Sequence, residues 1–239
     1  MNEAWTGAWR WISENADGRP TITSTRYCYL VVRKNRSPAT STPLSDADAA
    51  TLLRGILAAA GGTLETTVNG DEWSQIHANF VALYPKDASS TVLRAVQVSG
   101  DDMAEQVLDP DGNVLDDNQY VRISHAGDSD LAGAWELRQS GWTGIVLFSD
   151  SRYQYLLTRD DRSPDTDSNA TDSELVELFR TTFAEAGNYR ENEGSLLITP
   201  DIAMNPADQG SESSRAFRLN EGELEFEVGG QTLTWEKVE

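Results

Sequence analysis

The stretch Tyr153-Gln-Tyr-Leu-Leu-Thr-Arg-Asp-Asp-Arg-Ser-Pro164 repeats a pattern that occurs earlier in the chain. The earlier stretch, Tyr27-Cys-Tyr-Leu-Val-Val-Arg-Lys-Asn-Arg-Ser-Pro38, shares Tyr-x-Tyr-Leu-x-x-Arg-x-x-Arg-Ser-Pro with it, and the two start 126 residues apart. The tripeptide Gly-Ala-Trp precedes both stretches, at residues 7–9 and 133–135, with the same offset. This period is longer than the roughly 20–50 residues of solenoid repeats, so the sequence predicts a duplicated domain.

The offset also predicts which later residues of the two copies are equivalent. It pairs Asn79 with Asn205, and beyond this point it falls to 121, where Arg94 matches Arg215. Both recurrences are explained by shared architecture at least as well as by shared chemistry. We expect a first domain over residues 1–124, a polar, glycine-containing linker over 125–130 and a second domain over 131–239.

The charge balance argues against several classes of partner. The 239 residues include 39 Asp and Glu but only 19 Lys and Arg, which gives a formal net charge of −20. Nucleic acids and anionic membranes bind basic surfaces, so we expect neither as a partner. An acidic surface with few lysines is typical of a protein kept soluble in salty medium, which favours a marine or salt-adapted bacterial source. An ordinary acidic cytosolic protein fits the composition equally well.

Targeting signals and metal-binding motifs are also missing from the sequence. No segment joins a basic start to an apolar run, and none approaches ~18–20 apolar residues, so we expect a cytoplasmic protein. Cys28 is the only cysteine, which excludes an internal disulfide and a thiolate zinc cluster, and its setting in a predicted strand favours a packing role. We expect no metal site and no cofactor.

Hydrophobic patterning predicts mostly strands, with one helix in each copy. The capping box Thr171-Asp-Ser-Glu174 begins one helix, which ends before Gly187. Ser45 caps the other, which ends before Gly61. A meander of strands suits an antiparallel barrel, which closes its own edges and leaves an interior for one small ligand. We therefore expect an all-β protein with one short helix per repeat, built as two tandem antiparallel β-barrels.

The second copy carries an ordered series of motifs: Gly-x-Trp, a basic Arg-Ser-Pro turn, Gly-x-Tyr, Asn-Pro with a later Gly, Arg-x-Phe, Gly-x-Leu and Trp-x-x-Val. These motifs stand at Gly133–Trp135, Arg159–Pro164, Gly187–Tyr189, Asn205–Gly210, Arg215–Phe217, Gly222–Leu224 and Trp235–Val238. In this order they resemble the bacterial and fungal lipocalin-like domain family. The resemblance covers residues 131–239 and implies a small β-barrel with an internal pocket.

The resemblance also implies a buried tryptophan at the base of each barrel. Trp9 and Trp135 should lie there, near the basic residue of the last strand, Arg122 or Lys237 respectively. The first copy departs from the family pattern at three places, which are Thr63-Leu64 in place of Gly-x-Tyr, Phe80 in place of Pro206, and Tyr120 in place of Trp235. We therefore expect the better-formed pocket in the second copy.

The repeated Tyr-x-Tyr strand is the first candidate for a binding site. Alternate residues share one face of a strand, so Tyr153, Tyr155 and Arg159 should lie on one side. An inward side would offer phenols and a guanidinium to an anionic or carbonyl-bearing ligand, whereas an outward side would be a solvated sheet face. The expected ligand-binding residues are Tyr27, Tyr29, Arg33, Tyr153, Tyr155, Arg159, Tyr189, Asn205 and Arg215.

Two function classes follow from these residues. The preferred one is binding of a small, partly apolar molecule, which could be anionic or carbonyl-bearing, in a barrel cavity. The alternative is a cofactor-independent isomerase, cyclase or lyase, with Tyr155, Arg159 and His77 as candidate catalytic groups. The expected partner is thus a small-molecule ligand or substrate, and a homodimer is left open. If the second barrel were filled by apolar side chains, the first barrel with His77 would be the better candidate.

Overall fold

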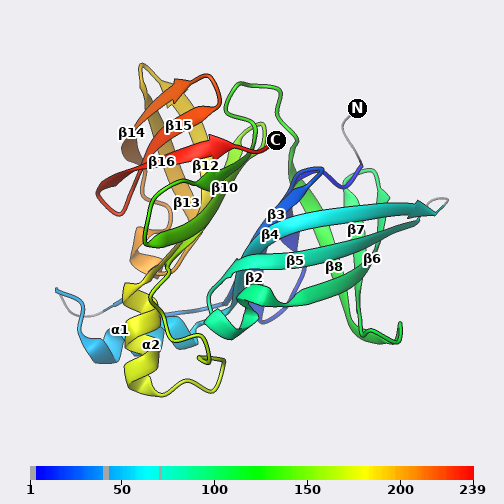
Figure 1. Ribbon diagram of the computed structural model, residues 1–239, viewed down its shortest axis with the longest axis horizontal. Coiled ribbons are helices and arrows are strands. Elements are labelled where there is room, and N and C mark those ends of the chain that lie inside the picture. Colours follow the sequence, from blue (N-terminus) through cyan, green and yellow to red (C-terminus); the bar gives the residue numbers. More distant parts are fainter. Residues whose placement is uncertain (1–3, 40–42, 70–71) are drawn as a thin grey trace.

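The computed structural model describes residues 4–39, 43–69 and 72–239, and these form two closed antiparallel barrels in tandem (Figure 1). The first barrel comprises β1 (Gly7–Trp11), β2 (Ala16–Ile22), β3 (Arg26–Arg33), β4 (Ile56–Asn69), β5 (Glu72–Ala82), β6 (Thr91–Ser99), β7 (Asp102–Leu108) and β8 (Val114–His125). The second comprises β9 (Gly133–Leu137), β10 (Trp142–Phe148), β11 (Arg152–Arg159), β12 (Thr182–Asn192), β13 (Ser195–Ala203), β14 (Ser213–Asn220), β15 (Glu223–Val228) and β16 (Gln231–Lys237). The predicted all-β fold with an internal duplication is confirmed.

Each barrel closes because its first strand pairs with its last. Strand β1 pairs with both β2 and β8, and β9 pairs with both β10 and β16. The remaining strands pair in chain order, so every connection is antiparallel. Closure gives each described strand a partner on both sides and turns alternate side chains toward the interior.

Each copy has one α-helix between its third and fourth strands, as predicted, but the helices end at Arg54 and Arg180, and the segments before Gly61 and Gly187 are already strand. Helix α1 (Asp46–Arg54) is capped by Ser45, whose hydroxyl accepts a hydrogen bond from the Asp48 amide at 3.1 Å. Helix α2 (Asp172–Arg180) begins at the Thr171–Glu174 capping box. The two helices lie side by side (Figure 1). Short 3₁₀ turns, η1 (Pro85–Ser89) and η2 (Pro206–Asp208), follow β5 and β13. Among the helices in the described ranges, none is long and apolar enough to span a membrane.

The predicted tryptophan at each barrel base is confirmed. Trp9 and Trp135 are fully buried. Each indole N–H donates to a backbone carbonyl four residues earlier, at 2.9 Å in both copies. The Arg122 guanidinium lies 4.0 Å from the centre of the Trp9 ring, and the Lys237 ammonium lies 5.2 Å from that of Trp135. A cation over each ring adds to the stability of the closed end.

The structure corrects the predicted equivalence of residues after the helices. Leu57 is an extra residue in a β-bulge, since Val31 pairs with Ala58 but Val32 pairs with Ile56. The β4–β5 hairpin is also longer than its counterpart, with strands of 14 and 11 residues against 11 and 9. The offset between equivalent residues of the two copies therefore falls to 121 within the β4–β5 hairpin. The sequence had predicted this change only after residue 79.

The matching glycines fix the corrected register. A Cβ at Gly62 would lie 2.0 Å from the Ala78 carbonyl oxygen, and one at Gly187 would lie 2.3 Å from that of Thr199. Asn79 follows Ala78, so its counterpart is Pro200. Asn205 precedes η2 as Tyr84 precedes η1, so the predicted pairing of Asn79 with Asn205 is wrong.

The two copies hold each other through a reciprocal pair of arginines from the repeated Arg-Ser-Pro segments. Arg36 donates to the Ala203 and Met204 carbonyls at 2.7 and 2.9 Å. Arg162 donates to the equivalent carbonyls, those of Ala82 and Leu83, at 3.0 and 2.8 Å. Burial lowers the pKa of both guanidinium groups to about 10, so both remain charged at neutral pH. Each copy therefore completes the carbonyl hydrogen bonds of the other.

An apolar core lies beneath these contacts and joins the barrels. It contains Cys28, Leu30, Leu53, Ile145, Leu147, Leu156, Leu178 and Ile202, among others from both copies. Cys28 is fully buried there, and burial raises the pKa of its thiol, in agreement with a packing role.

The last residue, Glu239, closes a second contact between the copies. Its side-chain carboxylate accepts hydrogen bonds from the backbone amides of Ser24 and Thr25 at 2.7 and 2.9 Å. The hydroxyls of Thr23, Ser24 and Thr25 donate to the same carboxylate. These residues form the turn between β2 and β3, so the end of the second copy binds a turn of the first.

Replacing Arg162 tests the reciprocal arginine contact. Arg162→Ala leaves two partly buried carbonyls without donors, and hydrogen bonds to a charged group contribute about 1.5–3 kcal/mol. We expect a loss of this size in the free energy of unfolding, measured in denaturant. Arg190→Ala removes an exposed ion pair with Glu212 and should change the free energy by less than about 0.5 kcal/mol. An equal effect of both variants would contradict the role assigned to Arg162.

Acid should weaken the Glu239 contact. Partial burial disfavours the charged carboxylate, but the hydrogen bonds from residues 23–25 outweigh burial and lower its pKa. The pKa of Glu239 is lower in the folded protein than in the unfolded chain, where it is about 4.3. The ionised carboxylate therefore stabilises the fold at pH values above about 4.3, and this contribution disappears as the pH falls through the folded-state pKa. The stability difference between wild type and Glu239→Gln should therefore be present at neutral pH and vanish in acid. The exposed Glu221→Gln provides the control, and a pH-independent difference would rule out the linkage.

Candidate functional site

The interior of the second barrel is filled by its own side chains. The inward-facing residues pack into one apolar cluster, which includes Trp135, Val146, Phe148, Leu157, Leu196, Ile198, Leu224, Phe226, Leu233 and Trp235. The expectation of a better-formed pocket in the second copy is therefore wrong. Large aromatic and aliphatic side chains occupy the space that a ligand would need.

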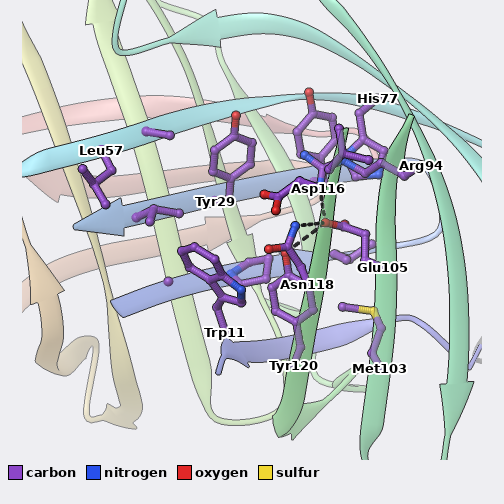
Figure 2. A pocket seen from close by; sticks show the side chains of 17 residues that line it. Trp11, Tyr29, Leu57, His77, Arg94, Met103, Glu105, Asp116, Asn118 and Tyr120 are labelled. Carbon is purple, nitrogen blue, oxygen red and sulfur yellow. Dashed lines mark hydrogen bonds and ion pairs between the residues drawn. The ribbon is translucent and has the colours of Figure 1, made fainter. Parts of the chain in front are cut away.

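The first barrel instead encloses a cavity of about 280 Å³ (Figure 2). Its apolar lining comprises Trp11, Pro20, Ile22, Val31, Leu57, Ala58, Met103 and Val107. Its polar lining comprises Tyr27, Tyr29, His77, Arg94, Glu105, Asp116, Asn118 and Tyr120. An apolar cavity with a few converging polar groups is the usual form of a small-molecule site.

Substitutions between the copies explain why the first interior is polar and open. The corrected register places four polar residues of the first barrel opposite apolar residues of the second. The pairs are Gln75 and Leu196, His77 and Ile198, Glu105 and Phe226, and Asn118 and Leu233. Exchanging Phe for Glu and Leu for Asn removes apolar atoms from the centre of the barrel and replaces them with groups that need hydrogen-bonding partners.

A buried ion pair lies in the wall of the cavity. Arg94 Nη1 on β6 is 2.5 Å from Glu105 Oε1 on β7. The same carboxylate oxygen accepts hydrogen bonds from the Tyr120 hydroxyl at 3.0 Å and from the Asn118 amide at 3.3 Å. Burial acts against the guanidinium charge, but the Glu105 carboxylate outweighs it and raises the pKa of Arg94. Arg94 is therefore charged and carries its counter-ion within the protein.

A second polar group lies on β3 and β5. The Tyr27 hydroxyl hydrogen-bonds Asn79 Oδ1, and the Tyr27 and His77 rings are 4.2 Å apart. His77 Nε2 lies 3.1 Å from Gln75 Oε1, and burial together with Arg94 lowers the pKa of His77 well below its ordinary value. Burial raises the pKa of Tyr27, Tyr29 and Tyr120. At neutral pH the imidazole is uncharged and the phenols keep their protons.

The predicted site residues separate into three environments. Tyr27 and Tyr29 line the first cavity, in agreement with the inward orientation of the strand. Tyr153 and Tyr155 also point inward, and Tyr153 donates to Glu185 at 2.8 Å, but they belong to the filled interior. Arg215 lies 3.5 Å from the same carboxylate.

The arginines at the ends of these strands lie outside. Arg33 and Arg159 are exposed, because β3 and β11 leave the barrel at these residues. Arg159 pairs with Asp161 at 2.8 Å and lies 5.4 Å from the Trp142 ring centre. The prediction that Arg159 shares the interior wall with Tyr153 and Tyr155 is therefore wrong.

Tyr189 and Asn205 have structural hydrogen bonds. The Tyr189 hydroxyl donates to the Ser149 carbonyl at 3.0 Å, and Asn205 caps η2 by accepting from the Ala207 amide at 3.1 Å. Asn205, Tyr155 and Glu185 border a separate hollow of about 450 Å³ between the second barrel and the segment that includes Ala39 and Leu44. Tyr155 belongs both to the lining of this hollow and to the interior cluster of the second barrel.

The sequence reasoning missed Glu105 and Asn118 as site residues, and it treated Arg94 only as the counterpart of Arg215. A usable signal was present. When the two copies are aligned at the corrected offset, several inward positions are polar in the first copy and apolar in the second. This contrast marks the cavity. The incorrect register after Leu57 hid this contrast for β4 and β5.

The comparisons with known proteins support the fold only. Neither protein-family models nor curated protein sequences match the chain. The crystal structure of an uncharacterized protein from Saccharomyces cerevisiae is similar with a TM-score of 0.59 and 11% identity, over 97% of each chain. A DNA polymerase sliding clamp from Pseudomonas aeruginosa matches with a TM-score of 0.14 and 9% identity, over 100% of this chain and 58% of that one, which is too low to indicate a shared fold. The lipocalin-like family is thus a resemblance and not an assignment.

A double-mutant cycle tests the Arg94–Glu105 pair. Glu105→Leu leaves a buried guanidinium unpaired and should destabilise the protein by about 3–5 kcal/mol in a denaturant titration. Replacing both residues, as Arg94→Met with Glu105→Leu, should cost clearly less than the sum of the single changes. The exposed pair Arg218–Glu225 is the control and should show a coupling below about 1 kcal/mol. Additive effects at Arg94 and Glu105 would show that the pair is not coupled.

Proposed function

We propose that the protein binds a small, partly apolar molecule in the cavity of its first barrel. The observation that carries this proposal is the contrast between two copies of one fold. The second copy fills its interior with Leu196, Ile198, Phe226 and Leu233, whereas the first leaves a cavity lined by polar and aromatic groups.

The energetics of burial support a binding role. Burying charged and polar side chains is costly even when they are paired, and well-packed apolar residues of similar volume are often as stable or more so. The second barrel retains one buried polar group, Glu185 with Tyr153 and Arg215, but it shows that this fold accepts apolar residues at the positions of Gln75, His77, Glu105 and Asn118. The polar lining of the first is thus better explained by a ligand than by stability, because departures from core packing are expected at functional sites.

The protonation states favour binding over acid–base catalysis. His77 has a strongly lowered pKa, the phenols have raised values, and Glu105 is engaged by three neighbours. A general acid or base works best with a pKa near the operating pH, which these shifts move away from. The groups are suited to donating and accepting fixed hydrogen bonds.

Titration with N-phenyl-1-naphthylamine, an uncharged dye that fluoresces in apolar surroundings, tests the proposal. We expect saturable binding at one site per chain. The double variant His77→Ile with Asn118→Leu installs the residues of the second barrel and should weaken binding by about ten-fold or more, because aliphatic groups then occupy the cavity. Thermal unfolding of the variant checks that the barrel is intact.

Arg159→Ala is the matched control for this titration. Its side chain is exposed and pairs with Asp161 outside the barrel, so dye affinity should not change. Absence of saturable binding, or unchanged affinity in the folded double variant, would contradict the proposed function.

A further inference from the structure

We infer that the cavity of the first barrel selects uncharged ligands that carry a hydrogen-bond donor and discriminates against anions. This inference rests on the proposed function and adds the chemical class of the ligand. It follows from how the single arginine in the cavity wall is paired, from the groups left without partners, and from the charge around the opening.

The guanidinium of Arg94 is already neutralised by the protein. Its ion pair with Glu105 is short, at 2.5 Å, and the two side chains are only 13% and 4% exposed. A carboxylate or phosphate ligand would have to compete with Glu105 for the same guanidinium. Two anions near one cation in a region of low dielectric repel each other strongly, so an anionic ligand is disfavoured.

The opening of the cavity adds to this discrimination. Asp116, at the exposed edge of the lining, presents a further carboxylate (Figure 2). The chain as a whole carries a formal charge of −20. Both charges lower the local concentration of anions at the entrance.

Glu105 and Tyr29 each leave a polar atom available to a ligand. All the contacts found for Glu105 engage Oε1, and within the described residues none engages Oε2. The Tyr29 hydroxyl borders the cavity and, within residues 4–39, 43–69 and 72–239, has no hydrogen-bonding partner. Glu105 Oε2 can accept from an N–H or O–H group of the ligand, and Tyr29 can donate to an oxygen.

A cationic ligand fits less well than an uncharged one. It would donate to the Oε2 atom of a carboxylate whose charge Arg94 already balances, and it would bring a second positive charge into a buried site that holds one balanced pair. The uncharged imidazole of His77 offers no compensating charge. A primary amide or an alcohol on an aromatic or aliphatic body matches the free acceptor, the free donor and the apolar lining.

Three probes with one ring system test this inference: 2-naphthamide, which is uncharged, 2-naphthoate, an anion, and 2-naphthamidine, a cation. Each is titrated against the full chain saturated with N-phenyl-1-naphthylamine at neutral pH. We expect the amide to displace the dye with at least about ten-fold higher affinity than either charged probe.

The variant Glu105→Gln tests the cause of the discrimination. It keeps the size and hydrogen-bonding capacity of the side chain but leaves the charge of Arg94 unbalanced. Affinity for 2-naphthoate should then rise by about ten-fold relative to that for the amide. Glu212→Gln, an exposed change on the second barrel, alters the net charge equally and should leave the ratio unchanged.

The outcomes separate this inference from the proposed function. If the dye does not bind, the proposed function fails and the inference fails with it. If the dye binds but naphthoate or naphthamidine matches the amide, or the amide does not displace it, the ligand class is wrong while the binding function stands. An unchanged ratio in folded Glu105→Gln overturns the role given to the ion pair.

Discussion

Closure of an eight-stranded barrel is the constraint on which the rest of this structure depends. Once β1 pairs with β8, and β9 with β16, each barrel encloses a space that side chains can just fill or that can hold one small ligand. Each inward side chain must then either fill part of this space or line a cavity within it. The second barrel contributes volume, with Phe226 and Trp235 fully buried at its centre. The first barrel has polar side chains at the equivalent positions, and these shorter side chains leave a cavity open.

The duplication allows the two barrels to differ in this way without losing the fold. Both keep the buried tryptophan with a cation over its ring, the helix between the third and fourth strands, and the arginine of the Arg-Ser-Pro segment. These shared features lie at the base of each barrel or at the contact between the copies. The differences lie in the interiors, where the Glu-to-Phe and Asn-to-Leu exchanges change the lining and leave the architecture intact. A filled barrel can thus support a neighbour whose interior stays open.

The contacts between the copies make this support mutual. Arg36 binds the carbonyls at the end of β13, and Arg162 binds the equivalent carbonyls at the end of β5. Strand β5 also carries His77, so an arginine from the second copy holds the end of a strand that lines the cavity. Glu239 binds the β2–β3 turn, which lies beside Tyr27. The positions of two cavity-lining strands therefore depend on contacts from the other copy.

The sequence by itself determined the duplication, the barrel class and the start of each capped helix, because these depend on local patterns and on repeats that a single chain displays, whereas the buried tryptophans were implied by the resemblance to the lipocalin-like family. It also placed Tyr27 with Tyr29, and Tyr153 with Tyr155, on one face of each strand, since alternation along a strand is a local property, but it left open whether that face points inward. Only the tertiary structure decided that Arg159 leaves the barrel, that Asn205 corresponds to Tyr84, and that the cavity belongs to the first copy. The physical reason is that a bulge at Leu57 and a longer hairpin shift the register, and that the space left inside a barrel depends on side chains from all eight strands together. Arg94, Glu105 and Asn118 come together because the registers of the β6–β7 and β7–β8 pairings place them side by side.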